Sequence, residues 1–296
     1  MKVVVSGASG LLGSALVPAL ERRGHDVLRL VRREARDSTE VAWDPVAGTV
    51  DSAALVGVHA AVSLSGANLN RRWTAAHKRE ILDSRVSSTN LLARTLAELE
   101  PRPGVLVSAG GCGIYGDRGD EIVTEESELG TGFLADVGRA WEAAAEPARA
   151  AGLRVVSFRQ GMVLTRDGGA LRQMLLPFKL GVGGRVASGQ QWWSWVSLDD
   201  LVAAYLFVLD GDVAGPVNLA SPSPATSAVF AKALGRALHR PAVLPVPAFT
   251  IKLLFGERGE AVVIEGQRTL PARLLDAGFT FSYPDIDVAL EHALAA

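Results

Sequence analysis

Three glycines near the start of the chain have the spacing of a turn that can hold a phosphate group. Gly7, Gly10 and Gly13 follow an apolar segment and open a helical pattern. The first glycine permits a tight turn, the second lets the backbone approach a pyrophosphate, and the third lets helix and strand pack closely. The helix N-terminus also attracts negative charge. The pattern predicts a dinucleotide site with contacts at Gly7, Ser9, Gly10, Leu11, Leu12 and Gly13.

A second signal concerns the type of dinucleotide. In such folds an Asp or Glu about twenty residues past the glycines binds the ribose hydroxyls, whereas an Arg accommodates a 2′-phosphate. Here Val31 is followed by Arg32 and Arg33, and the nearest acid is Glu34. A charge-assisted contact from Arg32 would be worth about 1.5–3 kcal/mol, so we predict NADP(H) in preference to NAD(H). The alternatives are NAD bound through Glu34 and a solvated basic loop.

The elements that must position these residues are short apolar strands alternating with helices. Strands are predicted over 2–5, 27–31, 60–64, 105–108 and 154–158. Helices are predicted over 11–23, 74–100 (with a break near Asp83) and 133–151. Apolar strands separated by helices indicate a parallel sheet that is covered on both faces and wound right-handedly. The fold class is therefore α/β, a Rossmann-type doubly wound parallel sheet.

The second half of the chain has a different pattern. It contains a glycine-rich stretch at 181–189, a tryptophan-rich strand at 192–196, a helix from Leu198 and several proline-punctuated loops. We expect a dinucleotide-binding domain over 1–160 and a smaller mixed substrate-binding lobe over 161–296, without a polar linker between them.

Composition excludes several classes of function. The chain is 48% hydrophobic and 21% charged with a formal net charge of −2, so it has no basic excess for nucleic acid. No apolar run approaches the roughly 20 residues that a membrane span needs. A single cysteine, Cys112, forms no internal disulfide, and the histidines lack metal-ligand spacing. We expect a cytoplasmic protein with a small-molecule substrate and no metal, and the sequence leaves its oligomeric state open.

Short motifs spread over the whole chain carry a resemblance to a known family. The chain resembles the atypical, epimerase-like subfamily of the extended short-chain dehydrogenase/reductase superfamily, which implies a Rossmann fold, an NAD(P) cofactor and a family-specific C-terminal segment. The motifs are LSGAN (64–68), RWT (72–74), DSRV (83–86), YGDRG (115–119), WEAA (141–144), GQQW (189–192), WVSLDD (195–200), GPVN (215–218), ALGRAL (233–238) and AGF (277–279) before Tyr283 and Pro284.

The resemblance also implies cofactor contacts, at Ser63, Leu64, Glu80, Arg85 and Met162. Among these, we expect Arg85 to hold a cofactor phosphate and Glu80 to orient it. The alternative is a surface ion pair between the two side chains, worth less than about 1 kcal/mol.

The chain departs from the family at the positions that transfer protons. Active members use a Tyr, a Lys four residues later and a Ser or Thr, and all three set the geometry and the pKa of the proton donor. Counted from Trp141 and Glu142, the Tyr and Lys positions fall on Leu134 and Gly138. The hydroxyl position falls near Gly110 or Gly111.

Other side chains could supply the chemistry instead. We consider Tyr115 as proton donor and Ser108 as hydroxyl donor. We also consider Cys112 as a nucleophile or a substrate contact, and the alternative is that its thiol is buried and inert.

The family's diphosphate-binding Arg corresponds to Trp193, which predicts a weakly charged, apolar or aromatic substrate unless Trp193 is simply part of the core. Two functions follow: an NADP(H)-dependent oxidoreductase or epimerase, or a non-catalytic NADP(H)-binding or redox-sensing protein.

Overall fold

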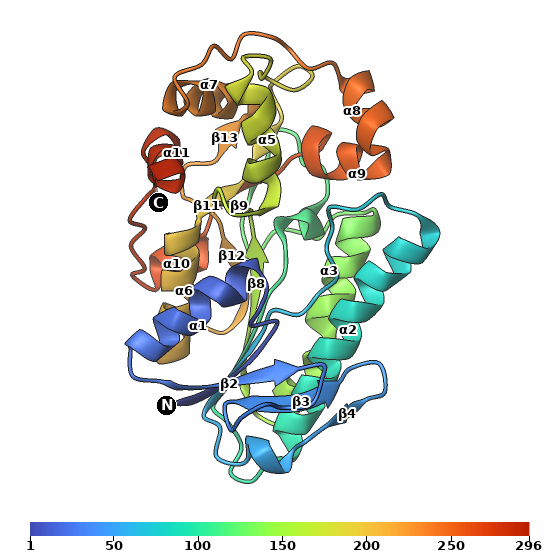
Figure 1. Cartoon of the computed structure of the whole chain (residues 1–296), viewed down its shortest axis with the longest axis vertical. Helices are drawn as coiled ribbons and strands as arrows, with labels where there is room; N and C mark the ends of the chain where they lie inside the picture. The colour runs from blue at the N-terminus through green and yellow to red at the C-terminus, as the bar shows by residue number, and fades with distance from the viewer. Residues whose placement is uncertain (296) are drawn as a thin grey trace.

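One large sheet forms the centre of the molecule (Figure 1). The computed structural model describes residues 1–295. The sheet has eight strands in the order β12-β8-β6-β5-β1-β2-β3-β4, and its neighbouring strands are parallel except β3 and β4. This confirms the predicted doubly wound α/β fold. The strands are β1 Lys2–Ser6, β2 Asp26–Val31, β3 Glu40–Asp44, β4 Thr49–Val50, β5 Ala60–Ser63, β6 Val105–Ser108, β8 Arg154–Gln160 and β12 Gly215–Leu219.

Helices cover both faces of the sheet because its strands are apolar on both faces. Successive strand residues point to opposite sides, and in β1 the side chains of Val3 and Val5 pack with Leu16 of α1, whereas Val4 packs with Leu92 of α2. In Figure 1, α1 and α6 lie on one side of the sheet and α2 and α3 on the other. These helices are α1 Leu11–Arg22, α2 Ala75–Glu98, α3 Phe133–Ala143, α4 Glu146–Ala150 and α6 Leu198–Asp210.

Two predicted helices differ from the structure. Helix α2 runs without the expected break, and Asp83 lies exposed on its surface. The helix predicted over 133–151 is divided into α3 and α4, with Pro147 in the first turn of α4. Proline lacks a backbone N–H and fits the first turn of a helix but not its interior. Pro147 would have interrupted a continuous helix, and α4 therefore starts as a separate helix at this point.

The strand predicted over 192–196 is also divided in two. Trp192–Trp193 (β10) pairs with Ala225–Thr226 (β13), and Trp195–Ser197 (β11) pairs with Met162–Leu164 (β9). Ser194, between the two strands, donates a hydrogen bond to the Gln267 carbonyl at 2.7 Å. This single apolar segment therefore contributes one strand to each of two small sheets.

A second core holds the C-terminal lobe together, at the top of Figure 1. Among its buried side chains are Trp193, Trp195, Phe230 and Leu290. The lobe also contacts the first part of the chain, where the Lys78 ammonium group lies 2.6 Å from the Glu257 carboxylate. Its helices and remaining strands are α5 Gly169–Lys179, α7 Ser227–Ala237, α8 Ala248–Phe255, α9 Glu257–Gly259, α10 Ala272–Asp276, α11 Ile286–Ala295 and β14 Arg268–Thr269, which pairs with β7 Ile122–Val123.

The division of the chain after residue 160 stays a prediction. Two elements from beyond that point, α6 and β12, lie with the large sheet, and β12 forms its outer edge beside β8. The chain therefore returns to the first core before it completes the lobe. No helix within residues 1–295 is long and apolar enough to cross a membrane.

Candidate functional site

The loop between β1 and α1 brings backbone groups close together and leaves the start of α1 uncovered. Gly7 has a φ of 70°, and a β-carbon on it would lie 2.8 Å from the Leu64 carbonyl carbon. A β-carbon on Gly13 would lie 2.4 Å from the Gly7 carbonyl oxygen. At Gly10 the nearest atom to a β-carbon is that same oxygen, at the looser distance of 3.2 Å.

Gly10 also begins helix α1 without a side-chain cap. The backbone N–H groups of the first helical turn have no partner within a helix, so they are available to an anion. The geometry is compatible with the expected contacts, which are Gly7, Ser9, Gly10, Leu11, Leu12 and Gly13, and these stay predictions.

The two arginines that follow β2 have different surroundings. Arg33 binds both carboxylate oxygens of Glu40 at 2.7 Å, and this bond, with help from the Arg36 N–H, lowers the pKa of Glu40 to about 2. Arg32 is exposed, and within residues 1–295 it has no ion pair. It lines a cavity of about 370 Å³ together with Trp43 and Asp51. Arg32 is thus the arginine that remains available to a ligand.

At the end of β5, the expected contacts Ser63 and Leu64 turn out to be engaged within the protein. The Ser63 hydroxyl is fully buried and lies 3.1 Å from the Thr89 hydroxyl, which accepts a hydrogen bond from the Trp141 indole N–H at 2.9 Å. The Leu64 N–H donates to the Ser6 carbonyl oxygen at 3.2 Å. The Ser63 side chain therefore connects β5 to α2 and, through Thr89, to α3, whereas the Leu64 side chain is only partly buried.

Arg85, on α2, is a buried cation without an anionic partner. Its side chain is only 8% exposed, and its Nη1 donates to the Ile81 carbonyl oxygen at 3.0 Å. The guanidinium group lies 4.9 Å from the centre of the Trp141 ring and closely approaches Gly66, where a β-carbon would be 3.0 Å from Cζ. Burial lowers the pKa of Arg85 to about 10, so the group stays charged at neutral pH.

The expectation that Glu80 orients Arg85 is wrong. The Glu80 carboxylate instead lies 2.9 Å from Nδ1 of His77, which is three residues earlier on α2. Positions five apart on a helix point in different directions, whereas positions three or four apart share a face. Within the described part of the chain, Arg85 has no carboxylate within ion-pair distance. An uncompensated buried charge is costly, and an anionic ligand would remove that cost.

Two further expected contacts lie in the C-terminal lobe. Met162 is half-buried in β9, and its N–H donates to the Ser194 carbonyl oxygen at 2.8 Å. Trp193 is buried, packs edge to face on Phe230 with ring centres 5.3 Å apart, and donates its indole N–H to the Val263 carbonyl oxygen. This geometry favours the core alternative for Trp193 over a substrate contact.

Helix α3 packs closely at the positions that correspond to the family's Tyr and Lys. It contacts the 3-10 turn Cys112–Tyr115 (η2). A β-carbon on Gly138 would lie 2.8 Å from Cβ of Ile114, and one on Gly113 would lie 3.0 Å from Cδ1 of Leu134. The space that a lysine side chain would need at position 138 is thus already filled.

The alternative groups Ser108 and Cys112 lie inside the protein. Ser108 is 1% exposed and its hydroxyl donates to the Ala109 carbonyl oxygen at 3.3 Å. The Cys112 thiol lies 3.1 Å from the Arg159 carbonyl oxygen, and burial raises its pKa to about 12. A thiol with this pKa stays protonated at neutral pH, so Cys112 behaves as the inert alternative.

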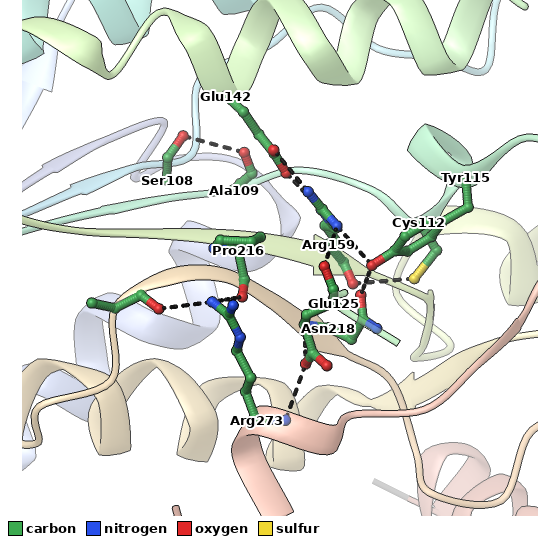
Figure 2. A network of polar contacts seen from close by, with 11 residues as sticks. Ser108, Ala109, Cys112, Tyr115, Glu125, Glu142, Arg159, Pro216, Asn218 and Arg273 are labelled. Carbon is green, nitrogen blue, oxygen red and sulfur yellow. Dashed lines mark hydrogen bonds and ion pairs between the residues drawn. The ribbon is translucent and has the colours of Figure 1, made fainter. Parts of the chain in front are cut away.

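Tyr115 is also closed off from solvent, which argues against its expected role as a proton donor. Its hydroxyl donates to Oδ1 of Asn218 at 2.7 Å and accepts from Nη1 of Arg159 at 2.8 Å (Figure 2). The side chain is fully buried, and this burial raises the pKa of Tyr115. The hydroxyl proton is already hydrogen-bonded, and the side chain is shielded from solvent. The phenol therefore has a structural role, because it links η2 to the ends of β8 and β12.

Arg159, at the centre of Figure 2, connects this tyrosine to α3. Its Nε and Nη2 bind the two carboxylate oxygens of Glu142 at 2.7 and 3.0 Å. Burial alone would lower the pKa of Arg159, but the bonds with Glu142 and Tyr115 outweigh it and raise the pKa. The pair is therefore charged and bidentate, with the Arg159 side chain buried and the Glu142 side chain 23% exposed.

The network continues from Asn218 into the C-terminal segment. Oε1 of Glu125 accepts from the Asn218 N–H at 2.9 Å and from the Arg273 N–H at 3.3 Å. The Asn218 amide donates to the Leu270 carbonyl oxygen at 2.9 Å. Glu142 and Asn218 lie in motifs that carry the family resemblance, WEAA and GPVN, but nothing in the sequence indicated that they belong to one network.

Comparison with known proteins identifies two family models in the chain. The model described as the NAD dependent epimerase/dehydratase family matches residues 3–220. A domain of unknown function matches residues 246–293. The epimerase family protein Mb2239 of Mycobacterium bovis is 42% identical over 293 residues, which cover 98% of this chain and 97% of that protein.

Two crystal structures are similar over nearly the whole chain. Human epimerase family protein SDR39U1 (isoform 2), crystallised with NADPH, is 35% identical with a TM-score of 0.90 and 100% coverage of both chains. A nucleoside-diphosphate sugar epimerase from Corynebacterium glutamicum is 36% identical with a TM-score of 0.82, covering 99% of this chain and 58% of the other.

The packing of α3 against η2 leads to a first prediction. Gly138→Lys should lower the free energy of unfolding by at least about 3 kcal/mol, because a buried charge without a partner is added to an overpacked contact. Ala143→Lys, at an exposed position of the same helix, should change it by less than about 0.5 kcal/mol. Urea unfolding measures both. Native stability of Gly138→Lys would show that the lysine position is open after all.

The bonds of the Tyr115 hydroxyl lead to a second prediction. Tyr115→Phe should lower the free energy of unfolding by about 1–3 kcal/mol, because it leaves Asn218 Oδ1 buried without a donor. NADPH affinity, measured by fluorescence titration, should not change. Tyr283→Phe is the matched control, since no hydrogen bond of the Tyr283 hydroxyl occurs within residues 1–295. Full stability of Tyr115→Phe would contradict the structural role.

Proposed function

Because this chain belongs to the NAD dependent epimerase/dehydratase family, we propose that it binds NADP(H) and exchanges hydride with a small, weakly charged substrate. The observation that carries the proposal is a set of groups that can bind anions and that lie near the ends of three neighbouring strands. These are the uncapped start of α1 after β1, Arg32 after β2, and Arg85, which lies against Gly66 after β5. The NADPH in the structure of the human relative supports the same cofactor.

Each of these groups matches one part of the cofactor. The N–H groups of the first turn of α1 would bind the pyrophosphate, and Gly10 leaves room for it to approach. Arg32 would bind the 2′-phosphate, because Arg33 is occupied by Glu40. Arg85 would hold a phosphate group of the cofactor, and this contact would neutralise its buried charge. NADP(H), when bound, supplies the hydride donor or acceptor, and open α/β sheets place such ligands at the carboxyl ends of the strands.

The substrate side supports a ligand with little charge. The family's diphosphate-binding arginine corresponds to Trp193, which is buried and bonded to a carbonyl group. Without a guanidinium at that position, the cost of removing a diphosphate from water is not compensated there. Apolar side chains such as Leu134 and Met162 are only partly buried and would suit an apolar or aromatic substrate.

Two observations favour a second function, in which NADP(H) is bound without turnover. The close contact of Gly138 with Ile114 excludes a lysine, and the Tyr115 hydroxyl is bonded inside the protein. A positioned acid or base typically contributes about 10²–10⁴-fold to the rate. A chain without such a group could use the cofactor as a structural or redox-sensing ligand.

A turnover assay distinguishes the two functions. Purified protein is incubated with NADPH and a panel of neutral aliphatic and aromatic carbonyl compounds, and cofactor oxidation is followed at 340 nm. Oxidation by a neutral compound, lost in Gly10→Val, supports the oxidoreductase. Tight NADPH binding with no turnover supports the second function. We expect no epimerisation of UDP-sugars in either case, and efficient turnover of one would contradict the argument from Leu134, Gly138 and Trp193.

The preference for NADPH is tested at Arg32. We expect NADPH to bind about tenfold to hundredfold more tightly than NADH, as a charge-assisted contact to the 2′-phosphate allows. Arg32→Ala should remove most of this difference and leave NADH affinity unchanged. Arg36→Ala, at an exposed position in the same loop, is the matched control. Equal affinities of the wild type for the two cofactors would overturn the assignment of Arg32.

A further inference from the structure

A cavity on the outside of the C-terminal lobe has an unusual charge. It measures about 780 Å³ and lies along one face of α7, between this helix and the loop that follows it. In Figure 1, α7 is at the end of the molecule opposite to β2, β3 and β4. The lining of the cavity combines small apolar residues with five basic side chains, those of Arg185, Lys232, Arg236, His239 and Arg240.

Every ionisable side chain that lines this cavity is basic, although the whole chain has a net charge of −2. Arg236 is neutralised by Asp287, at 2.6 Å. Arg185 donates to the carbonyl oxygens of Ala187 and Ser188. Arg240 donates to the carbonyl oxygens of Lys179 and His239. Carbonyl groups orient these two guanidinium groups without cancelling their charge.

Lys232 is a further basic side chain that lines this cavity. It is exposed near the middle of α7, and among residues 1–295 it has neither an ion pair nor a side-chain hydrogen bond. The helix dipole favours cations in a last turn, which accounts for Arg236. The dipole does not account for Lys232, or for Arg185 and Arg240, which lie outside the helix.

We propose that this cavity binds a phosphate-bearing organic anion, at a site separate from the dinucleotide site. Arginine forks and a lysine ammonium are the groups that bind phosphate oxygens. The volume falls within the range of about 300–1,000 Å³ for small-molecule sites. It is larger than a phosphate ion alone needs, which leaves space for an organic part. Ala228, Ala242 and Val243 give the organic part an apolar surface.

Titration calorimetry with inorganic pyrophosphate tests the proposal. Saturating NADPH is present throughout, so that the start of α1 is occupied. We expect one pyrophosphate per chain, with an affinity that falls as salt is added. Lys232→Glu should weaken binding at least tenfold and Lys232→Ala by less, while thermal unfolding confirms that both variants fold.

Arg94→Glu is the matched control, with the same charge change at an exposed position of α2, and its pyrophosphate affinity should equal that of the wild type. An equal loss in Arg94→Glu would reduce the effect to overall charge and overturn the proposal. So would an absence of binding to both pyrophosphate and the lipid vesicles described next.

The source of the phosphate group is distinguished with vesicles. Phosphatidylcholine vesicles with and without phosphatidic acid are sedimented with the protein. Co-sedimentation that requires phosphatidic acid and is lost in Lys232→Glu assigns the site to a lipid headgroup. Binding of pyrophosphate alone assigns it to a free phosphorylated metabolite. Because Lys232 lies outside the proposed cofactor contacts, failure of either test leaves the NADP(H) assignment unaffected.

Discussion

The polar network at the strand ends depends on the ion pair between Arg159, which is buried, and Glu142, which is partly exposed. A guanidinium removed from water is tolerated only when its N–H groups find good acceptors, and here the two carboxylate oxygens and the Tyr115 hydroxyl provide them. This requirement fixes α3 beside the end of β8. The Tyr115 hydroxyl belongs to η2, so the same bonds hold η2 against α3.

Glycines pack differently at the start of α1 and along α3. Around α1, β-carbons on Gly7 and Gly13 would meet backbone atoms at less than 3 Å, whereas one on Gly10 would have its nearest neighbour at 3.2 Å. Around α3, the close contact is made by Gly138 itself, on Ile114. At the first position a small residue would leave room for the proposed cofactor, and at the second the packing leaves no room for a larger side chain. Glycine thus has opposite consequences at the two positions, depending on what lies opposite.

The large sheet could be predicted because its signal is local. Runs such as Val105–Ser108 are apolar throughout and end at identifiable turns, and β6 has these bounds. The strands β3 and β4 escaped prediction because Glu40–Asp44 mixes charged and apolar residues and lies at the side of the sheet. The sequence favours a chemical role for Tyr115 because its position just after a strand is visible there. Its partner Asn218 lies 103 residues away in the sequence, and no local sequence pattern indicates a contact between residues so far apart.

The C-terminal return of the chain has a consequence for the order in which the molecule is made. Glu125 and Asn218 find their last partners at Leu270 and Arg273, and a ribosome produces these residues only after the entire sheet. Until then the edge strand β12 carries polar groups that await partners, and contacts so distant in sequence form slowly. A nascent chain of this protein therefore carries an unfinished sheet edge from the synthesis of β12 until residues 270–273 have been added. That interval is when chaperones would matter to it most.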